Sequence, residues 1–115
     1  MDLTVGDIVL CEFYFSDLKR SKKRPVLVFK DNLPHNDFIA IPISSQISKM
    51  HNDELLLSFK SFQTGSIPKD SKLMLRKTFV VSKNAIAKKY GTLSPKAYTL
   101  VHHTFCQYFK CIANI

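Results

Sequence analysis

The sequence predicts a mainly β fold, a small and strongly bent sheet or partly open barrel, followed by one C-terminal helix. Short runs rich in β-branched and aromatic residues recur as far as Val81, with polar turns between them. Apolar residues near the C-terminus then recur every three or four positions, as in an amphipathic helix. The length of 115 residues fits a single domain over 1–115, with no internal repeat or long linker.

The first three expected strands are short. Ile8–Phe15 follows the turn signal Gly6-Asp7. Arg24–Lys30 is a continuous apolar run, which predicts a strand that is buried on both faces or lies at a dimer contact. Phe38–Ile43 contains Pro42, which lacks a backbone donor, so that end should be an edge or a bulge. Polar connections are expected between these strands.

Two more strands are expected at Glu54–Phe59 and, as one long element, at Ser71–Val81. A short helix, Lys83–Tyr90, is then predicted to stop at Gly91. A hydroxyl cap followed by proline, Ser94-Pro95, predicts the start of the last helix. Its core-facing stripe would comprise Ala97, Leu100, Val101, Thr104, Phe105, Tyr108, Phe109 and Ile112.

Composition limits the function. The net charge of +8 is clustered, which favours an anionic partner such as nucleic acid, an acidic protein or an acidic membrane face over a protein that is merely basic. Cys11, Cys106 and Cys111 have no CxxC spacing, so we expect free thiols in a reducing cytoplasm and no metal site. No stretch approaches the roughly 20 apolar residues of a membrane span, and the first residues do not resemble a signal peptide.

The most informative segment is the basic loop Lys19–Lys23, which leads into Arg24-Pro25 and an apolar strand. The guanidinium of Arg24 is always charged, and its planar fork of donors fits a phosphate. The third expected strand, which ends at Ile43, is followed by the polar residues Ser44-Ser45-Gln46. A fixed Arg and a fixed hydroxyl at two strand ends beside a cationic loop predict a phosphodiester site.

Five segments carry a resemblance to a known family by their order and spacing. They are Val5-Gly6-Asp7-Ile8-Val9, Arg24-Pro25-Val26-Leu27-Val28, Ile41-Pro42-Ile43-Ser44-Ser45-Gln46, Pro68-Lys69-Asp70-Ser71-Lys72-Leu73 and Gly91-Thr92-Leu93-Ser94. Together they resemble the MazF/PemK toxins of bacterial type II toxin–antitoxin pairs, over nearly the whole chain.

The resemblance implies an SH3-like barrel with a terminal helix and a homodimer. It also implies a metal-independent endoribonuclease, without cofactor, that cuts single-stranded RNA, often messenger RNA, at short sequences by attack of the 2′-hydroxyl. A cognate antitoxin would neutralise it by covering the RNA groove. The gyrase poison CcdB shares the fold without nuclease activity, so fold alone does not decide the activity.

By the same resemblance, Arg24 occupies the family's catalytic Arg-Pro position, and Ser44 aligns with a hydroxyl residue that is most often Thr. Arg24 could instead pair with a carboxylate such as Asp7 or Glu12. Ser44 could instead be a turn serine, which is the commoner use of serine. Ser45 and Gln46 are the adjacent alternatives.

The proton acceptor is the weakest assignment. Family members carry a carboxylate in the first loop or an acid or amide on a later strand, where this chain has Lys19–Lys23, Arg76 and Lys77. The possible substitutes are Asp17, His35 and His51, since histidine is the usual general base near neutral pH. Arg76 and Lys77 could also contribute positive charge at the scissile phosphate, with little formal base catalysis.

RNA backbone contacts are expected from the basic loop and from the segment after the third strand. The residues are Lys19, Arg20, Lys22, Lys23, Ser45, Gln46 and Lys49. Tyr14 and Phe15 could stack on bases, or belong to the core or a dimer contact. Two rival functions remain open: a binding module of the same fold that does not cleave RNA, acting on nucleic acid or on a protein such as gyrase, and a basic protein that docks an acidic partner.

Overall fold

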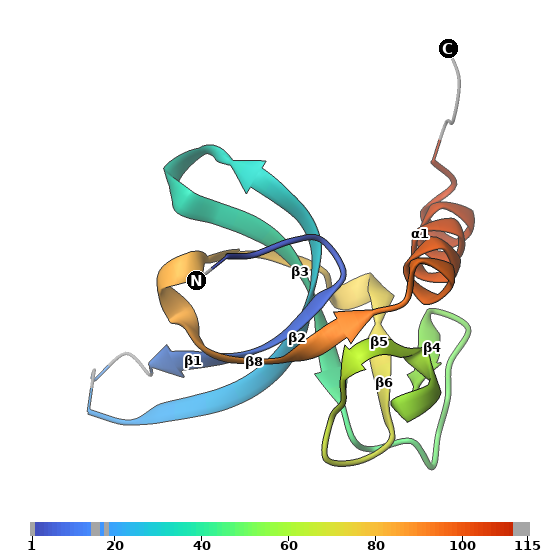
Figure 1. Cartoon of the computed structure of the whole chain (residues 1–115), viewed down its shortest axis with the longest axis horizontal. Coiled ribbons are helices and arrows are strands. Elements are labelled where there is room, and N and C mark those ends of the chain that lie inside the picture. The colour runs from blue at the N-terminus through green and yellow to red at the C-terminus, as the bar shows by residue number, and fades with distance from the viewer. Residues whose placement is uncertain (1, 15–16, 18, 112–115) are drawn as a thin grey trace.

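The computed structural model describes residues 2–14, 17 and 19–111. Within them, eight antiparallel strands form one curled sheet that is open on one side, and a single α-helix lies beside it (Figure 1). The strands are β1 (Asp7–Tyr14), β2 (Ser21–Leu33), β3 (Asp37–Ser44), β4 (Glu54–Leu57), β5 (Phe62–Gly65), β6 (Ser71–Met74), β7 (Phe79–Ser82) and β8 (Ile86–Leu93), and the helix is α1 (Pro95–Phe109).

The strand order is β4-β6-β3-β2-β1-β8-β5, and β7 also pairs with β3. Four single turns of 3₁₀ helix connect strands, at Pro34–Asn36, Phe59–Ser61, Leu75–Lys77 and Lys83–Ala85. This architecture confirms the prediction of a mainly β, small bent barrel with a C-terminal helix. α1 has 15 residues, and no helix of the described chain combines the length and apolar character of a membrane span.

β2 lies at the centre of two apolar clusters, because both of its faces are covered. Val26 and Val28 face one cluster, whereas Leu27 and Phe29 face the other, which includes Val101 of α1. All four β2 side chains are almost wholly inaccessible to water. The prediction of burial on both faces is therefore confirmed, and the alternative of a dimer contact through this run is wrong.

Helix α1 begins where the sequence predicts. The Ser94 hydroxyl oxygen accepts a hydrogen bond from the Ala97 N–H (3.1 Å), and Pro95 fills the first turn. The helix packs on the sheet through Tyr98, whose hydroxyl donates to the Phe29 carbonyl oxygen (2.6 Å), and through Phe105, whose ring lies 4.7 Å from that of Phe29. The amphipathic spacing thus correctly predicted the packed positions Ala97, Val101 and Phe105. Leu100 and Phe109 of the predicted stripe are exposed, and Ile112 lies outside the described residues.

The expected helix Lys83–Tyr90 is wrong. Ser82 does cap a turn, since its hydroxyl oxygen accepts from the Asn84 N–H (3.1 Å), but that 3₁₀ turn ends at Ala85 and the chain continues as β8. Gly91 does not end a helix. It pairs with Gly65 across β8 and β5, where an added Cβ would lie 2.3 Å from the Thr64 carbonyl oxygen. Glycine is needed there because two backbones approach closely.

The expected long strand Ser71–Val81 is divided by the 3₁₀ turn Leu75–Lys77. The Leu75 N–H donates to the Asp53 carbonyl oxygen (2.9 Å), and beyond the turn β7 pairs with the opposite end of β3. On this side, β3 pairs with β7 before Pro42 and with β6 after it. The missing backbone N–H of Pro42 therefore costs little. The predicted strand Glu54–Phe59 ends earlier, as β4, at Leu57. The predicted strand Arg24–Lys30 is longer in the structure, because β2 extends into the polar connections on both sides of it.

Candidate functional site

Arg24 and Ser44 line one cavity of about 760 Å³. β2 and β3 are antiparallel, with Val26 opposite Pro42, so two further residues along each strand place Arg24 opposite Ser44. Side chains alternate along β2, which puts Arg24 on the same face as Val26. Tertiary pairing thus joins the two strand ends that the sequence singled out.

Strand β6 and the 3₁₀ turn after it complete the cationic wall of this cavity. Lys72 pairs directly with Ser44 across β3 and β6. Arg76 and Lys77 come from the turn, and both are exposed. The cavity therefore holds four cations against two carboxylates, Asp53 and Glu54, an excess that suits a phosphate group.

A buried ion pair holds the loop between β3 and β4. The Nζ of Lys72 lies 2.9 Å from Oε1 of Glu54 and donates to the Lys49 carbonyl oxygen (2.9 Å). The His51 N–H donates to the same Glu54 oxygen (2.8 Å). Burial works to raise the pKa of Glu54, but these bonds from His51 and Lys72 lower it overall. Glu54 is therefore an ionised anchor and a weak proton acceptor.

The remaining cations differ in their partners. Arg76 Nε lies 3.7 Å from Asp53 Oδ2. Within the described residues, the side chains of Arg24 and Lys77 make no hydrogen bond or ion pair. The alternative pairing of Arg24 with Asp7 or Glu12 is not observed: Asp7 binds the side chains of Thr4, Thr92 and Lys89, and Glu12 accepts from the Ser21 hydroxyl. The Arg24 guanidinium is thus available to an anion.

Ser44 forms a turn and also lines the cavity. Its hydroxyl oxygen accepts a hydrogen bond from the Gln46 N–H (3.1 Å), as in a serine turn. A hydroxyl can accept and donate at once. The turn orients the oxygen, and the hydroxyl proton remains for a ligand in the cavity.

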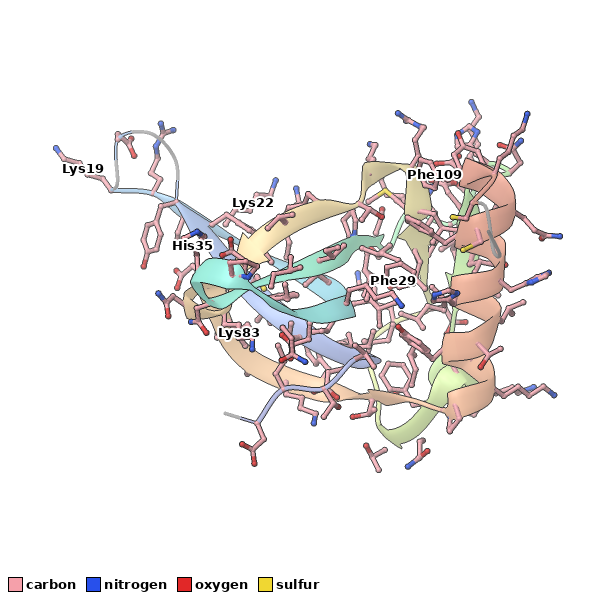
Figure 2. The ribbon with its side chains drawn as sticks, turned by 90° about the horizontal axis from the view of Figure 1, so that it is seen from above. Lys19, Lys22, Phe29, His35, Lys83 and Phe109 are labelled. Carbon is pink, nitrogen blue, oxygen red and sulfur yellow. The ribbon has the colours of Figure 1, made fainter. Side chains whose placement is uncertain are left out.

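Of the three predicted proton acceptors, only His51 lines the cavity. Asp17 is exposed on the β1–β2 hairpin, where the Lys19 N–H and the Arg20 side chain lower its pKa. His35 lies in the turn between β2 and β3, near Lys83 and away from α1 (Figure 2). The structure therefore leaves Asp17 and His35 outside the site.

Five charged or aromatic residues of the cavity were not predicted from the sequence. Asp53, Glu54 and Lys72 come together only because β4 pairs with β6. Phe13 and Phe79 form an aromatic pair at the cavity wall, with ring centroids 5.9 Å apart. The sequence contained one signal for Phe13. It lies two residues after the buried Cys11, so both side chains are on the same face of β1.

The predicted backbone contacts divide into two groups. Lys19 lies at the tip of the β1–β2 hairpin, which projects from the body, and Lys22 lies on its β2 strand (Figure 2). Lys23 and Ser45 line a second cavity of about 240 Å³. Gln46 lines both cavities, which share Arg24 and Ser44 as well.

Arg20 and Lys49 each contact another part of the chain. Arg20 pairs with Asp17 (Nε to Oδ2, 2.9 Å), and both side chains are exposed. The Lys49 carbonyl oxygen accepts from Lys72, while the Lys49 residue is exposed. The described residues contain no cluster of three or more His, Cys, Asp or Glu side chains that could hold a metal ion.

Comparisons with known proteins show which family and which solved structures this chain resembles. Residues 4–109 match the family model described as PemK-like, MazF-like toxin of type II toxin–antitoxin system. A search of curated protein sequences found no significant match. Similar solved structures include a mycobacterial endoribonuclease in complex with its cognate antitoxin (TM-score 0.68, 12% identity, covering 98% of this chain and 100% of that one).

A second similar structure is the Mycobacterium tuberculosis toxin MazF-mt6 (TM-score 0.66, 14% identity, covering 90% of this chain and 98% of that one). At these identities the likeness concerns the fold. The family match spans both cavity-forming strands, β2 and β3, and the whole curled sheet. The chain belongs to the PemK-like, MazF-like toxin family of type II toxin–antitoxin systems.

Proposed function

We propose that this toxin is a sequence-selective endoribonuclease that cuts single-stranded RNA, messenger RNA in particular, in the cytoplasm and without a metal ion. The observation that carries the proposal is the shared cavity of Arg24 and Ser44, in which the guanidinium has no partner among the described residues. A phosphodiester supplies the anion that this cation lacks.

The proposed reaction is attack of the 2′-oxygen on the adjacent phosphorus, with cleavage of the bond to the 5′-oxygen. The products are a 2′,3′-cyclic phosphate and a 5′-hydroxyl end. Arg24 and the Ser44 hydroxyl donate to the non-bridging oxygens, where negative charge develops. A preorganised donor of this kind typically contributes about 3–4 kcal/mol to transition-state stabilisation. Lys77 adds positive charge beside them.

His51 is the proposed proton acceptor for the 2′-hydroxyl. Its backbone is fixed by the bond to Glu54, and within the described residues its ring makes no hydrogen bond. The ionised Glu54 carboxylate also interacts electrostatically with His51, and histidine is the usual general base near neutral pH. Water in the open cavity supplies the proton that the leaving 5′-oxygen needs.

The remaining features concern binding. Phe13 and Phe79 offer ring surfaces on which bases can stack, and the hairpin lysines Lys19 and Lys22 contact the RNA backbone. An acidic cognate antitoxin would occupy the same cationic cavity.

We also propose a homodimer, on the basis of the family and of apolar side chains that are exposed outside the cavity, such as Leu56 and Leu100.

The test is cleavage of a long single-stranded RNA by purified protein with a metal chelator present, followed by mapping of both ends. We expect discrete cuts that leave cyclic phosphate and 5′-hydroxyl ends. Arg24→Ala should reduce the rate at least about 100-fold, whereas Lys96→Ala, an exposed cation on α1, should not change it. Binding without cuts would favour the non-cleaving module, and dependence on added metal would contradict the chemistry.

A further inference from the structure

A pair of thiols lies at the end of α1, outside the cavity and unrelated to the proposed RNA chemistry. Cys106 is in the last turn of the helix and is half-buried, and Cys111 follows the helix and is exposed. This is the end of the helix that carries Phe109 (Figure 2).

The backbone brings these two residues together. Lys110 adopts a left-handed conformation (φ 55°, ψ 48°), and its N–H donates to the Cys106 carbonyl oxygen. The Cys111 N–H donates to the same oxygen (2.9 Å). The bond from Cys111 is the 6→1 bond of a Schellman motif, and the bond from Lys110 is the 5→1 bond of an αL cap. In a Schellman motif the side chains at the positions of Cys106 and Cys111 commonly touch. A disulfide needs Cα atoms about 4.4–6.8 Å apart, and a backbone hydrogen bond holds two residues at such close range.

The surroundings of Cys106 suit thiol chemistry. The Cys106 Sγ lies 4.0 Å from Nδ1 of His102, one helical turn earlier. Interaction with the Cys111 thiol, and then burial, raises the pKa of Cys106, while the charge of Lys30 lowers it. Cys111 should react first, because it is the more exposed of the two thiols.

We propose that Cys106 and Cys111 form a reversible dithiol–disulfide site that reacts with low-molecular-weight disulfides such as glutathione disulfide. The Cys111 thiolate attacks glutathione disulfide, forming a mixed disulfide and releasing one glutathione thiolate. Cys106 then gives its proton to His102 and attacks the Cys111 sulfur. That step closes the internal disulfide and releases the second glutathione, so two protein thiols are oxidised and one glutathione disulfide is reduced.

Formation of the mixed disulfide also assists the second step. It removes the Cys111 thiol whose interaction contributes most to the raised pKa of Cys106. The closed product would fix the last turn of α1. Cys11 takes no part, since it is wholly buried in β1 and burial raises its pKa to about 11.

The experiment equilibrates the full chain in glutathione buffers of graded redox ratio, traps free thiols with iodoacetamide, and maps the products by mass spectrometry. We expect a Cys106–Cys111 bond with a mass decrease of about 2 Da, and an unmodified Cys11. Cys106→Ser should leave glutathione on Cys111, because the resolving thiol is gone. Circular dichroism establishes that each variant is folded.

The matched pair Lys110→Gly and Lys110→Pro tests the geometry. Glycine keeps access to the left-handed conformation, so closure should match the wild type. Proline fixes φ near −65°, and the equilibrium constant for closure should fall at least about tenfold as the effective concentration of the two thiols drops. Glutathione that accumulates on wild-type Cys111 beside a free Cys106, or closure that is unchanged in Lys110→Pro, would overturn the proposal.

Discussion

The ammonium of Lys72 lies 2.9 Å from the Glu54 carboxylate, and the two side chains are only 9% and 7% exposed. The pair connects β6 with the first residue of β4, beneath the loop that carries His51. Two buried charges of opposite sign cost little when paired and much when separated. The Lys72–Glu54 pair therefore stabilises the fold at the candidate catalytic site.

Replacing Lys72 by methionine should therefore destabilise the fold. The change leaves the Glu54 charge buried without its partner and removes the bond to the Lys49 carbonyl oxygen. We expect the free energy of unfolding to fall by about 3–5 kcal/mol, measured by urea denaturation. Lys69→Met, at an exposed position nearby, should change it by less than about 0.5 kcal/mol. Equal stability of the two variants would show that the pair is not needed.

The same pair predicts a dependence of stability on pH. The folded-state pKa of Glu54 lies below the ordinary value of 4.5 for a glutamate side chain. Its contribution is therefore complete well above pH 4.5 and is lost as the pH falls through the lowered pKa. Urea unfolding at several pH values should show stability declining over that acidic range, with a shallower decline in Glu54→Gln. A parallel decline in both proteins would assign the effect to other carboxylates.

Ser44 should affect the rate of cleavage more than binding. Ser44→Ala removes a donor aimed at charge that develops during the reaction, so kcat should fall about 100- to 1,000-fold with little change in KM. Ser44→Thr keeps the hydroxyl and should retain most of the activity. Ser48→Ala, at an exposed position that lines neither cavity, serves as the control. An unaffected Ser44→Ala enzyme would leave Ser44 with its turn role alone.

The β1–β2 hairpin should contribute salt-dependent affinity without sequence preference. Lys19 and Lys22 carry charges that can contact phosphates, and each contact to single-stranded RNA contributes about 0.7 to the slope of log K against log salt. The double variant Lys19→Ala/Lys22→Ala should therefore lower that slope by about 1.4, measured by fluorescence anisotropy with several RNA sequences. The preferred cleavage sequence should stay the same. A slope like that of the wild type would place RNA away from the hairpin.

Gly91→Ala should destabilise the sheet, because the new Cβ would meet the Thr64 carbonyl oxygen at 2.3 Å and the Gly65 Cα at 2.9 Å. Neither obstacle is a flexible side chain, so β5 must move away from β8. We expect a loss of about 1–3 kcal/mol or more in thermal or urea unfolding. A variant as stable as the wild type would mean that β5 is not held at this distance in solution.

Local sequence was informative where one element determines the outcome. The cap and proline at Ser94-Pro95 predicted the start of α1, and the apolar run of β2 predicted burial on both faces. The errors occurred where distant pairing decides. The segment Lys83–Tyr90 has polar residues and a capping serine, as a short helix would, but from Ile86 onward its backbone pairs with β1 instead. No local pattern contains that information.

The candidate site divides in the same way. The sequence alone determined that an arginine, whose fork of donors suits a phosphate, enters a buried strand and that a hydroxyl ends another, because side-chain chemistry and alternation belong to each strand by itself. Tertiary structure decided which groups share the cavity. It placed His51, Asp53 and Lys72 there and left Asp17 and His35 outside, because antiparallel register and the curl of the sheet bring residues together across distances that sequence spacing does not measure.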